Sequence, residues 1–244
     1  DAAVCAAAPG GLAGFDVTQV DGAAAPREPA AQRRFLRRGM GRGATGPKGR
    51  SQRPSGAGDL LAFLRGLGPD SRGRYLGEIL AWDFERLEAV HDYIQWIFPT
   101  DEQSRHSLGA PVLTRELCRL AIEDGAVLAS IRKSFERFCD FLGLEVVPGA
   151  ASDGAPGLAV RKAPHFEDRV PVCWFTRCVG NHNWLRISRV LHCLRLVGLT
   201  DEAAAFLVCL EGLHKDGIPC GYAVKHWRRR AAAEVGGAGS RCPA

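Results

Sequence analysis

The stretch His91-Asp92-Tyr93-Ile94-Gln95-Trp96-Ile97-Phe98-Pro99 decides how this chain folds. Apolar side chains recur in and before it at helical spacing, and Pro99 is expected to stop the helix because proline donates no backbone hydrogen bond. Asp83 is well suited to cap the start of this helix. The stripe that the helix would bury comprises Leu87, Ile94 and Phe98, with His91 in the same row. The pattern predicts a helix from Asp83 to Pro99 with one apolar face.

Helical patterns continue on both sides of this stretch, whereas no stretch alternates apolar and polar residues for long enough to predict a strand. The fold class predicted is therefore all-α, as a single compact multi-helix domain. The further helices expected are one capped by Asp59, one over Tyr75–Trp82, one capped by Thr114, one over Leu128–Leu142 ended by Gly143, one after Asn183 ended by Gly198, and one capped by Thr200 that buries Phe206, Leu207, Leu210 and Leu213.

Composition divides the 244 residues into three parts. Residues 1–58 are rich in Ala, Gly and Arg and hold too little apolar surface to offset the entropy of ordering, so we expect a disordered basic N-terminal arm. Residues 59–215 carry the helical domain, within which residues 147–171, rich in Pro, Gly, Ala and Asp, are expected to form a mobile loop. Residues 216–244 are expected to be a loose C-terminal tail with one short helix over Tyr222–Ala233.

The composition also limits the class of protein. No apolar stretch approaches the length of a spanning helix, so a membrane role would have to be peripheral. The nine cysteines are odd in number and irregularly spaced, which favours free thiols in a reducing compartment over a disulfide framework. We therefore expect an intracellular protein, placed in the nucleus or cytoplasm if the source is a eukaryote.

The sequence holds no Gly-rich phosphate loop, no paired-histidine zinc helix and no nucleophile elbow. One group of thiols and imidazoles has suitable metal ligands at a spacing that matches no common zinc module, and we expect buried thiols and a structural histidine there instead. That group is Cys173, Cys178 and His182 with His192 or Cys193. No catalytic residue, metal or cofactor is therefore predicted.

The densest polar cluster is Asn181-His182-Asn183-Trp184-Leu185-Arg186-Ile187-Ser188-Arg189. One interpretation is a ligand site, in which arginine binds a carboxylate and asparagine and histidine bind polar groups. The other is a network of helix caps and hydrogen bonds between helices, which the spacing favours. Similarly, the spacing favours core positions for His91, Tyr93, Trp96 and Phe98. A ligand site would require the two runs to meet around a cavity.

These two runs, with Ala110-Pro111-Val112-Leu113-Thr114 between them, resemble the conserved region of the opioid growth factor receptor family over about residues 59–213. The resemblance implies a domain without spanning helices that binds an enkephalin-type peptide. It also implies association with the nucleus and its envelope, so that peripheral membrane association is consistent with the family.

The first functional hypothesis is a non-enzymatic module that binds a short peptide or a protein segment. Its expected ligand contacts are His91, Tyr93, Trp96, Phe98, Asn181, His182, Asn183, Arg186 and Arg189.

Two alternatives stay open. A nucleic-acid-associated protein would use the basic arm over Arg33–Arg53 together with Arg228-Arg229-Arg230. An enzyme would use His91 or His182, and would require both in one open pocket near a carboxylate.

Overall fold

The computed structural model describes residues 57–104, 107, 109–150, 156–175 and 181–232. All of them belong to one compact unit, residues 50–244. The predicted arm, apart from its last two residues, and the end of the predicted tail lie outside the described residues.

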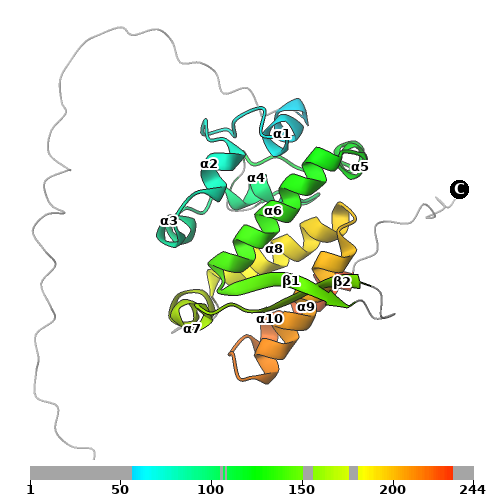
Figure 1. Ribbon diagram of the computed structural model, residues 1–244. Coiled ribbons are helices and arrows are strands. Elements are labelled where there is room, and N and C mark those ends of the chain that lie inside the picture. Colours follow the sequence, from blue (N-terminus) through cyan, green and yellow to red (C-terminus); the bar gives the residue numbers. More distant parts are fainter. Residues whose placement is uncertain (1–56, 105–106, 108, 151–155, 176–180, 233–244) are drawn as a thin grey trace, which may run out of the picture. The chain divides into compact units, whose positions relative to one another are not determined.

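The described residues are mostly helical, which confirms the all-α class (Figure 1). In chain order the elements are α1 (Ala57–Leu64), α2 (Leu76–Leu80), α3 (Phe84–Ala89), α4 (Ile94–Ile97), α5 (Arg115–Glu123), α6 (Gly125–Phe141), β1 (Leu144–Ala150), β2 (Pro156–Lys162), α7 (Phe166–Arg169), the π-helical turn η2 (Val170–Trp174), α8 (His182–Leu196), α9 (Thr200–Lys215) and α10 (Gly221–Ala232). None of the helices in the described ranges is both long and apolar enough to cross a membrane.

Several helix ends fall where the sequence predicts them. The side chains of Asp83 and Thr114 accept hydrogen bonds from the first turns of α3 and α5. The short helix expected near the C-terminus is α10. Two predicted caps are wrong: Asp59 lies inside α1, which begins at Ala57, and Thr200 is the first residue of α9, whose preceding residue makes no side-chain cap.

The single helix predicted from Asp83 to Pro99 is wrong, because it is divided into α3 and α4. Val90 leaves the helical conformation, with ψ of 131°, and ends α3. The carbonyl groups thus left without a helical partner are bound by Arg186 of α8, distant in the sequence. A long-range contact of this kind is invisible to an analysis of local periodicity.

The predicted loop at residues 147–171 is a second correction. Residues 151–155 of it lie outside the described residues. Around them, β1 pairs with β2 as an antiparallel hairpin in which Leu144 faces Lys162 and Val147 faces Ala159, and α7 and η2 follow. Pro and Gly within the strands obscure their alternation in the sequence, and β2 is stabilised by packing against α9. Tertiary contact therefore outweighs local composition here.

Gly143 joins α6 to this hairpin and confirms the predicted end of α6. Its φ of +79° is a conformation that side-chain-bearing residues rarely adopt. A Cβ atom at this position would also lie 2.8 Å from the Cα of Phe166. Both backbone conformation and space therefore require glycine.

The core draws on every part of the described chain. Its largest buried side chains include Trp96 of α4, Trp174 of η2 and Trp227 of α10, each with at most 1% of its surface exposed. The indole groups of Trp174 and Trp227 donate hydrogen bonds to the carbonyl oxygens of Leu142 and Trp184. These bonds satisfy the polar ends of the buried rings, as the interior requires. α6 and α8 cross the middle of the domain (Figure 1).

Candidate functional site

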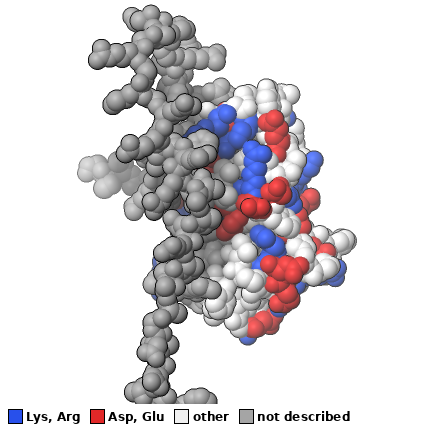
Figure 2. All heavy atoms as spheres, turned by 90° about the vertical axis from the view of Figure 1, so that its left-hand side faces the viewer, with Lys and Arg blue, Asp and Glu red and all other residues white. Residues whose placement is uncertain are grey.

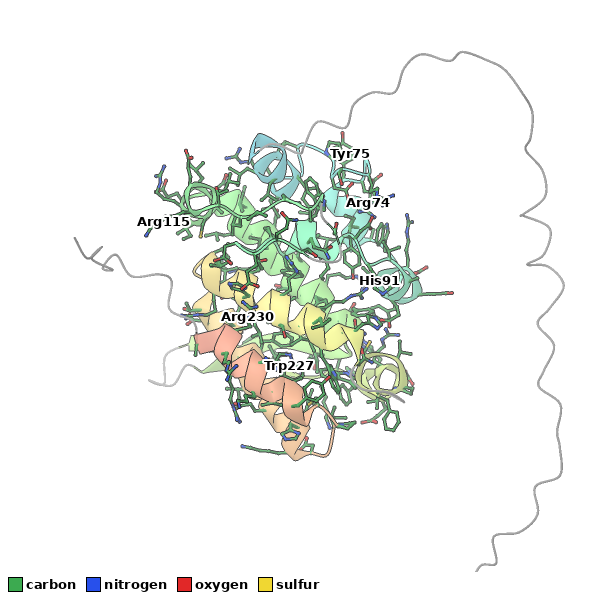
Figure 3. The ribbon with its side chains drawn as sticks, turned by 180° about the vertical axis from the view of Figure 1, so that it is seen from behind. Arg74, Tyr75, His91, Arg115, Trp227 and Arg230 are labelled. Atoms are coloured by element: carbon green, nitrogen blue, oxygen red, sulfur yellow. The ribbon has the colours of Figure 1, made fainter. Side chains whose placement is uncertain are left out.

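A cavity of about 740 Å³ lies where the two characteristic sequence runs meet. Its walls come from the start of α4, the loop after Phe98, one face of α8 and the end of α10. Figure 3 shows His91 and Arg230 towards different ends of α8. The side chains that line the cavity are His91, Ile94, Gln95, Thr100, Glu102, Gln103, Ser104, His182, Leu185, Arg186, Ser188, Arg189, His192 and Arg230.

The large aromatic residues of the first run do not line this cavity. Tyr93, Trp96 and Phe98 are core residues with at most 1% exposure. Trp96 packs edge-on against Phe63, and the Tyr93 hydroxyl donates to the carbonyl oxygen of Leu87. At this cavity the three aromatics, expected as ligand contacts, therefore offer no surface to a ligand.

The two asparagines of the second run form the predicted network of caps. The side-chain oxygen of Asn181 accepts a hydrogen bond from the backbone N–H of Asn183 and caps α8. Its amide group donates to the carbonyl oxygens of Val172 and Phe175. Asn183 is fully buried and donates to the carboxylate of Glu88 at 3.1 Å. Neither asparagine lines the cavity, so both hold its walls in place.

Arg186 joins the second run to the end of α3, just before the first run. It is 5% exposed, and its guanidinium donates to the carbonyl oxygens of Leu87, Glu88 and Val90 at the end of α3. It also donates to Asn183. Because these bonds engage both terminal nitrogens, Arg186 has little left to offer a ligand, although it lines the cavity.

Arg189, one helical turn further along α8, is less fully engaged. Its Nη1 donates to the carbonyl oxygen of Phe98 at 3.3 Å and to the hydroxyl of Thr100 at 3.1 Å. Among the described residues no carboxylate lies within ion-pair distance of it. Burial lowers the pKa of Arg189. Arg189 is thus a half-buried cation at the cavity whose Nη2 and Nε hydrogens are not engaged in the described part of the chain.

Gln95 brings a second incompletely bonded group to the same cavity. The residue is 5% exposed, and its amide nitrogen lies 3.5 Å from the hydroxyl of Ser104. Its carbonyl oxygen Oε1 accepts no hydrogen bond from any described residue. A buried amide oxygen without a donor is costly, so this atom calls for a donor from a ligand or from water.

The end of the cavity near α10 is closed by an ionic cluster. Arg230 pairs with both carboxylate oxygens of Glu102, at 2.6 and 2.8 Å, and also donates to Nδ1 of His192. Nε2 of His192 lies 3.1 Å from Asp101. Since arginine can only donate, neutral His192 carries its proton on Nε2 and donates it to Asp101. Burial, and then the charge of Arg230, lower the pKa of His192.

The other end of the cavity carries two histidines. The core position predicted for His91 is wrong, because its side chain is exposed and lines the cavity. The ring centres of His91 and His182 lie 5.1 Å apart, and Nε2 of His182 lies 3.0 Å from the carboxylate of Glu88. Although burial opposes it, hydrogen bonds from His182 and Asn183 lower the pKa of Glu88. The two histidines therefore share one open cavity with a carboxylate near, which is the geometry that the enzyme alternative requires.

The expected buried thiols are found among the described residues. Cys173 and Cys193 are fully buried, and burial raises the pKa of Cys173 to about 11 and that of Cys193 further. Arg169 donates to the sulfur of Cys173 at 3.2 Å. Protonated buried thiols are poor nucleophiles and metal ligands. Cys178 lies outside the described residues.

The basic triplet at the end of α10 is largely neutralised. Arg228 pairs with Glu211, and Arg230 pairs with Glu102. On the face drawn in Figure 2, acidic and basic side chains lie side by side where grey atoms do not cover them. The other part of the nucleic-acid hypothesis, Arg33–Arg53, lies outside the described residues, so that hypothesis stays a prediction.

The sequence analysis did not assign several residues to this site, namely Gln95, Thr100, Glu102, His192 and Arg230. It considered His192 only as a possible metal ligand and Arg230 only as part of a basic triplet. Gln95 had one available signal, because it is an amide within an otherwise apolar run and a core position there leaves its oxygen in need of a partner. The loop residues and Arg230 gave no such signal, since they approach α8 only through the tertiary fold.

Comparison with known proteins places the chain in a family. Residues 74–215 match the model described as the opioid growth factor receptor (OGFr) conserved region. The opioid growth factor receptor-like protein 1 of Mus musculus is 29% identical over 156 residues, which is 60% of this chain and 30% of the relative. The protein of the same name from Xenopus tropicalis is 31% identical over 121 residues, which is 48% of this chain and 20% of the relative.

The chain thus spans under a third of the length of these relatives. No solved structure matches it. Because the family model matches more than half of the chain, the chain belongs to the opioid growth factor receptor conserved-region family.

Proposed function

On the premise of this family membership, we propose that the domain is a non-enzymatic binding module that holds the free carboxyl end of a short peptide or protein segment in the cavity. One observation carries the proposal. The cavity is lined by Arg189, a cation without a carboxylate partner among the described residues, and by Gln95, whose buried Oε1 has no hydrogen-bond donor among them.

A peptide C-terminus supplies the complementary groups. Its carboxylate accepts hydrogen bonds from the planar guanidinium of Arg189, and a backbone N–H nearby donates to Gln95. Three arginines and one glutamate line the cavity, so its field favours an anion. A cavity of about 740 Å³ falls within the usual range for ligand sites, which is about 300–1,000 Å³, and accommodates a few residues.

The family resemblance implies a finer identity for this ligand, an enkephalin-type peptide, and implies opioid growth factor receptor activity for the protein. Such a pentapeptide ends in a free carboxylate and therefore belongs to the proposed class. The relatives are named for likeness to that receptor. The nuclear and peripheral membrane locations that the resemblance implies stay predictions.

The test measures binding of a fluorescently labelled enkephalin-type pentapeptide to the full chain, by anisotropy. The same peptide with an amidated C-terminus is the matched ligand. We expect the free acid to bind wild type about tenfold or more tightly than the amide, because charge-assisted hydrogen bonds to the carboxylate are lost in the amide. Arg189→Gln should weaken binding of the acid and remove this preference.

Arg119→Gln is the matched control, because Arg119 is an exposed arginine of α5 that pairs with Glu123 away from the cavity. It should leave both affinities unchanged. Equal binding of acid and amide by wild type, or an undiminished preference in Arg189→Gln, would refute the proposed mode. If neither peptide binds, a mixed library of free-acid pentapeptides replaces the enkephalin-type probe, and its failure to bind would refute the peptide class as well.

A further inference from the structure

We propose that His91 and His182, at the rim of the cavity, form a site for a divalent transition metal that prefers imidazole ligands, of the Zn²⁺ and Ni²⁺ class. The proposal rests on different residues from the peptide mode proposed above. It also departs from the absence of a metal site predicted from spacing, because the two histidines lie far apart in the sequence and meet only through the fold.

The separation of the two rings already suits a shared metal ion. A tetrahedral zinc ion holds each imidazole nitrogen at about 2 Å, which places the ring centres of two histidine ligands about 5 Å apart. The ring centres of His91 and His182 lie 5.1 Å apart, with their planes inclined at 52°. The two rings are therefore near the spacing at which one ion bridges them.

Each ring is also held in a tautomer that leaves one nitrogen available. Nδ1 of His91 lies 2.9 Å from the carbonyl oxygen of Ala89. A carbonyl oxygen only accepts, so Nδ1 carries the proton and Nε2 keeps its lone pair. In the same way, neutral His182 donates from Nε2 to Glu88 at 3.0 Å and keeps a lone pair on Nδ1.

These hydrogen bonds are those that accompany histidine ligands in metal sites, where the second ring nitrogen donates to a carboxylate or a backbone carbonyl. Glu88 is fixed in turn by the amide of buried Asn183, at 3.1 Å, and Asn183 accepts from Arg186. The network predicted from the Asn181–Arg189 run thus ends at an imidazole on the cavity rim. Both histidines are exposed, so a metal ion reaches them from solvent and keeps positions open for water or for a ligand in the cavity.

A second group of potential metal ligands lies near the other end of the cavity, where the ligand atoms of Asp101, Glu102 and His192 lie within 4.8 Å of one another. This group is a weaker candidate for a metal site than His91 and His182. Arg230 pairs with both oxygens of Glu102, and both nitrogens of His192 are already engaged. A metal ion there would have to displace a guanidinium. At His91 and His182 no such displacement is needed.

The test titrates the full chain with NiCl₂ under reducing conditions, by isothermal calorimetry. We compare wild type with His91→Ala and His182→Ala, which alter exposed side chains and should keep the fold, as circular dichroism verifies. His226→Ala is the matched control, because His226 is an exposed histidine of α10 that does not line the cavity. All four proteins keep the same cysteines, so a difference in affinity reports the histidine that was changed.

We expect one Ni²⁺ site in wild type and in His226→Ala, with affinity at least about tenfold weaker in each of the other two variants. Glu88→Gln should also weaken the site by about tenfold or more, since it removes the acceptor that orients His182. Equal affinity in wild type and the His91→Ala, His182→Ala double variant would overturn the proposal. If Ni²⁺ affinity fell in only one of the two single histidine variants, the proposal that both histidines bind the same ion would be overturned. Arg189→Gln, which tests the peptide mode, should leave Ni²⁺ binding unchanged, so the two proposals fail separately.

Discussion

The side chains of the two runs that enclose the cavity have different roles. The run His91–Pro99 places its large aromatics in the core, whereas the run Asn181–Arg189 uses its polar groups to bind the ends of other elements. As a result, most of the atoms that the sequence offers to a ligand are either buried or already hydrogen-bonded within the protein. Among the described residues that line the cavity, the groups left without a hydrogen-bond partner include Oε1 of Gln95, Nη2 and Nε of Arg189 and one ring nitrogen on each rim histidine. In this domain, polar atoms without hydrogen-bond partners indicate the candidate site better than residue types do.

The largest effect should come from the aromatic run. Trp96→Ala should lower the free energy of unfolding by about 3–5 kcal/mol, because it empties a fully buried site that packs against Phe63. Urea unfolding followed by circular dichroism measures this change. Leu185→Ala is the control, since Leu185 is 64% exposed and its loss should change stability by no more than about 0.5 kcal/mol. Similar losses in both variants would contradict the assignment of the aromatic run to the core.

The next largest loss of stability should come from the polar run Asn181–Arg189. Such a loss would show that part of this run also supports the fold. Arg186→Met should cost roughly 3 kcal/mol, because the carbonyl oxygens at the end of α3 lose a buried charged donor. Arg186→Lys should recover little, since an ammonium group cannot reproduce the planar fork that reaches several carbonyls. The same unfolding assay applies.

Arg189→Met serves as the comparison within the same helix and should cost less, because Arg189 makes two hydrogen bonds and is more exposed. If Arg186 and Arg189 proved equally important for stability, the distinction between a structural and a ligand-facing arginine would be lost.

These two residues also show how much the sequence could predict. The helix stop at Gly143, the caps at Asp83 and Thr114 and the core positions of Tyr93, Trp96 and Phe98 follow from local rules that need no partner. Local rules do not predict that Arg186 is structural while Arg189 faces the cavity. Both lie on α8, and they differ only in which distant carbonyl groups they reach. The break at Val90 and the β1–β2 hairpin escaped prediction for the same reason.

A smaller effect should follow acidification at the α10 end of the cavity. The pKa of His192 is lowered from its ordinary value of 6.5, so the unfolded chain binds the proton more readily than the folded one. Stability is therefore complete above about pH 6.5 and falls as the pH drops below that value and through the lowered pKa. The free energy of unfolding, measured by urea unfolding at a series of pH values, should show this fall in wild type and not in His192→Gln.

The lowered pKa of Glu88 gives a loss of the same sign that begins only below its ordinary value of 4.5. Glu88→Gln should therefore retain the decline that begins below pH 6.5. If that decline persists in His192→Gln, His192 does not cause it.

The smallest change in stability should have the opposite sign. Gln95→Leu keeps a similar volume and removes an amide whose oxygen accepts no hydrogen bond from the described residues, so stability should stay equal or rise by up to about 1 kcal/mol. The same variant should weaken binding of the free-acid pentapeptide, because the acceptor for its N–H is gone. Gain of stability with loss of affinity is expected where a binding site retains a polar group that the fold alone does not need. A clear loss of stability in Gln95→Leu would show instead that Gln95 supports the fold, and the cavity would then lose one of the two unmatched groups on which the proposed function rests.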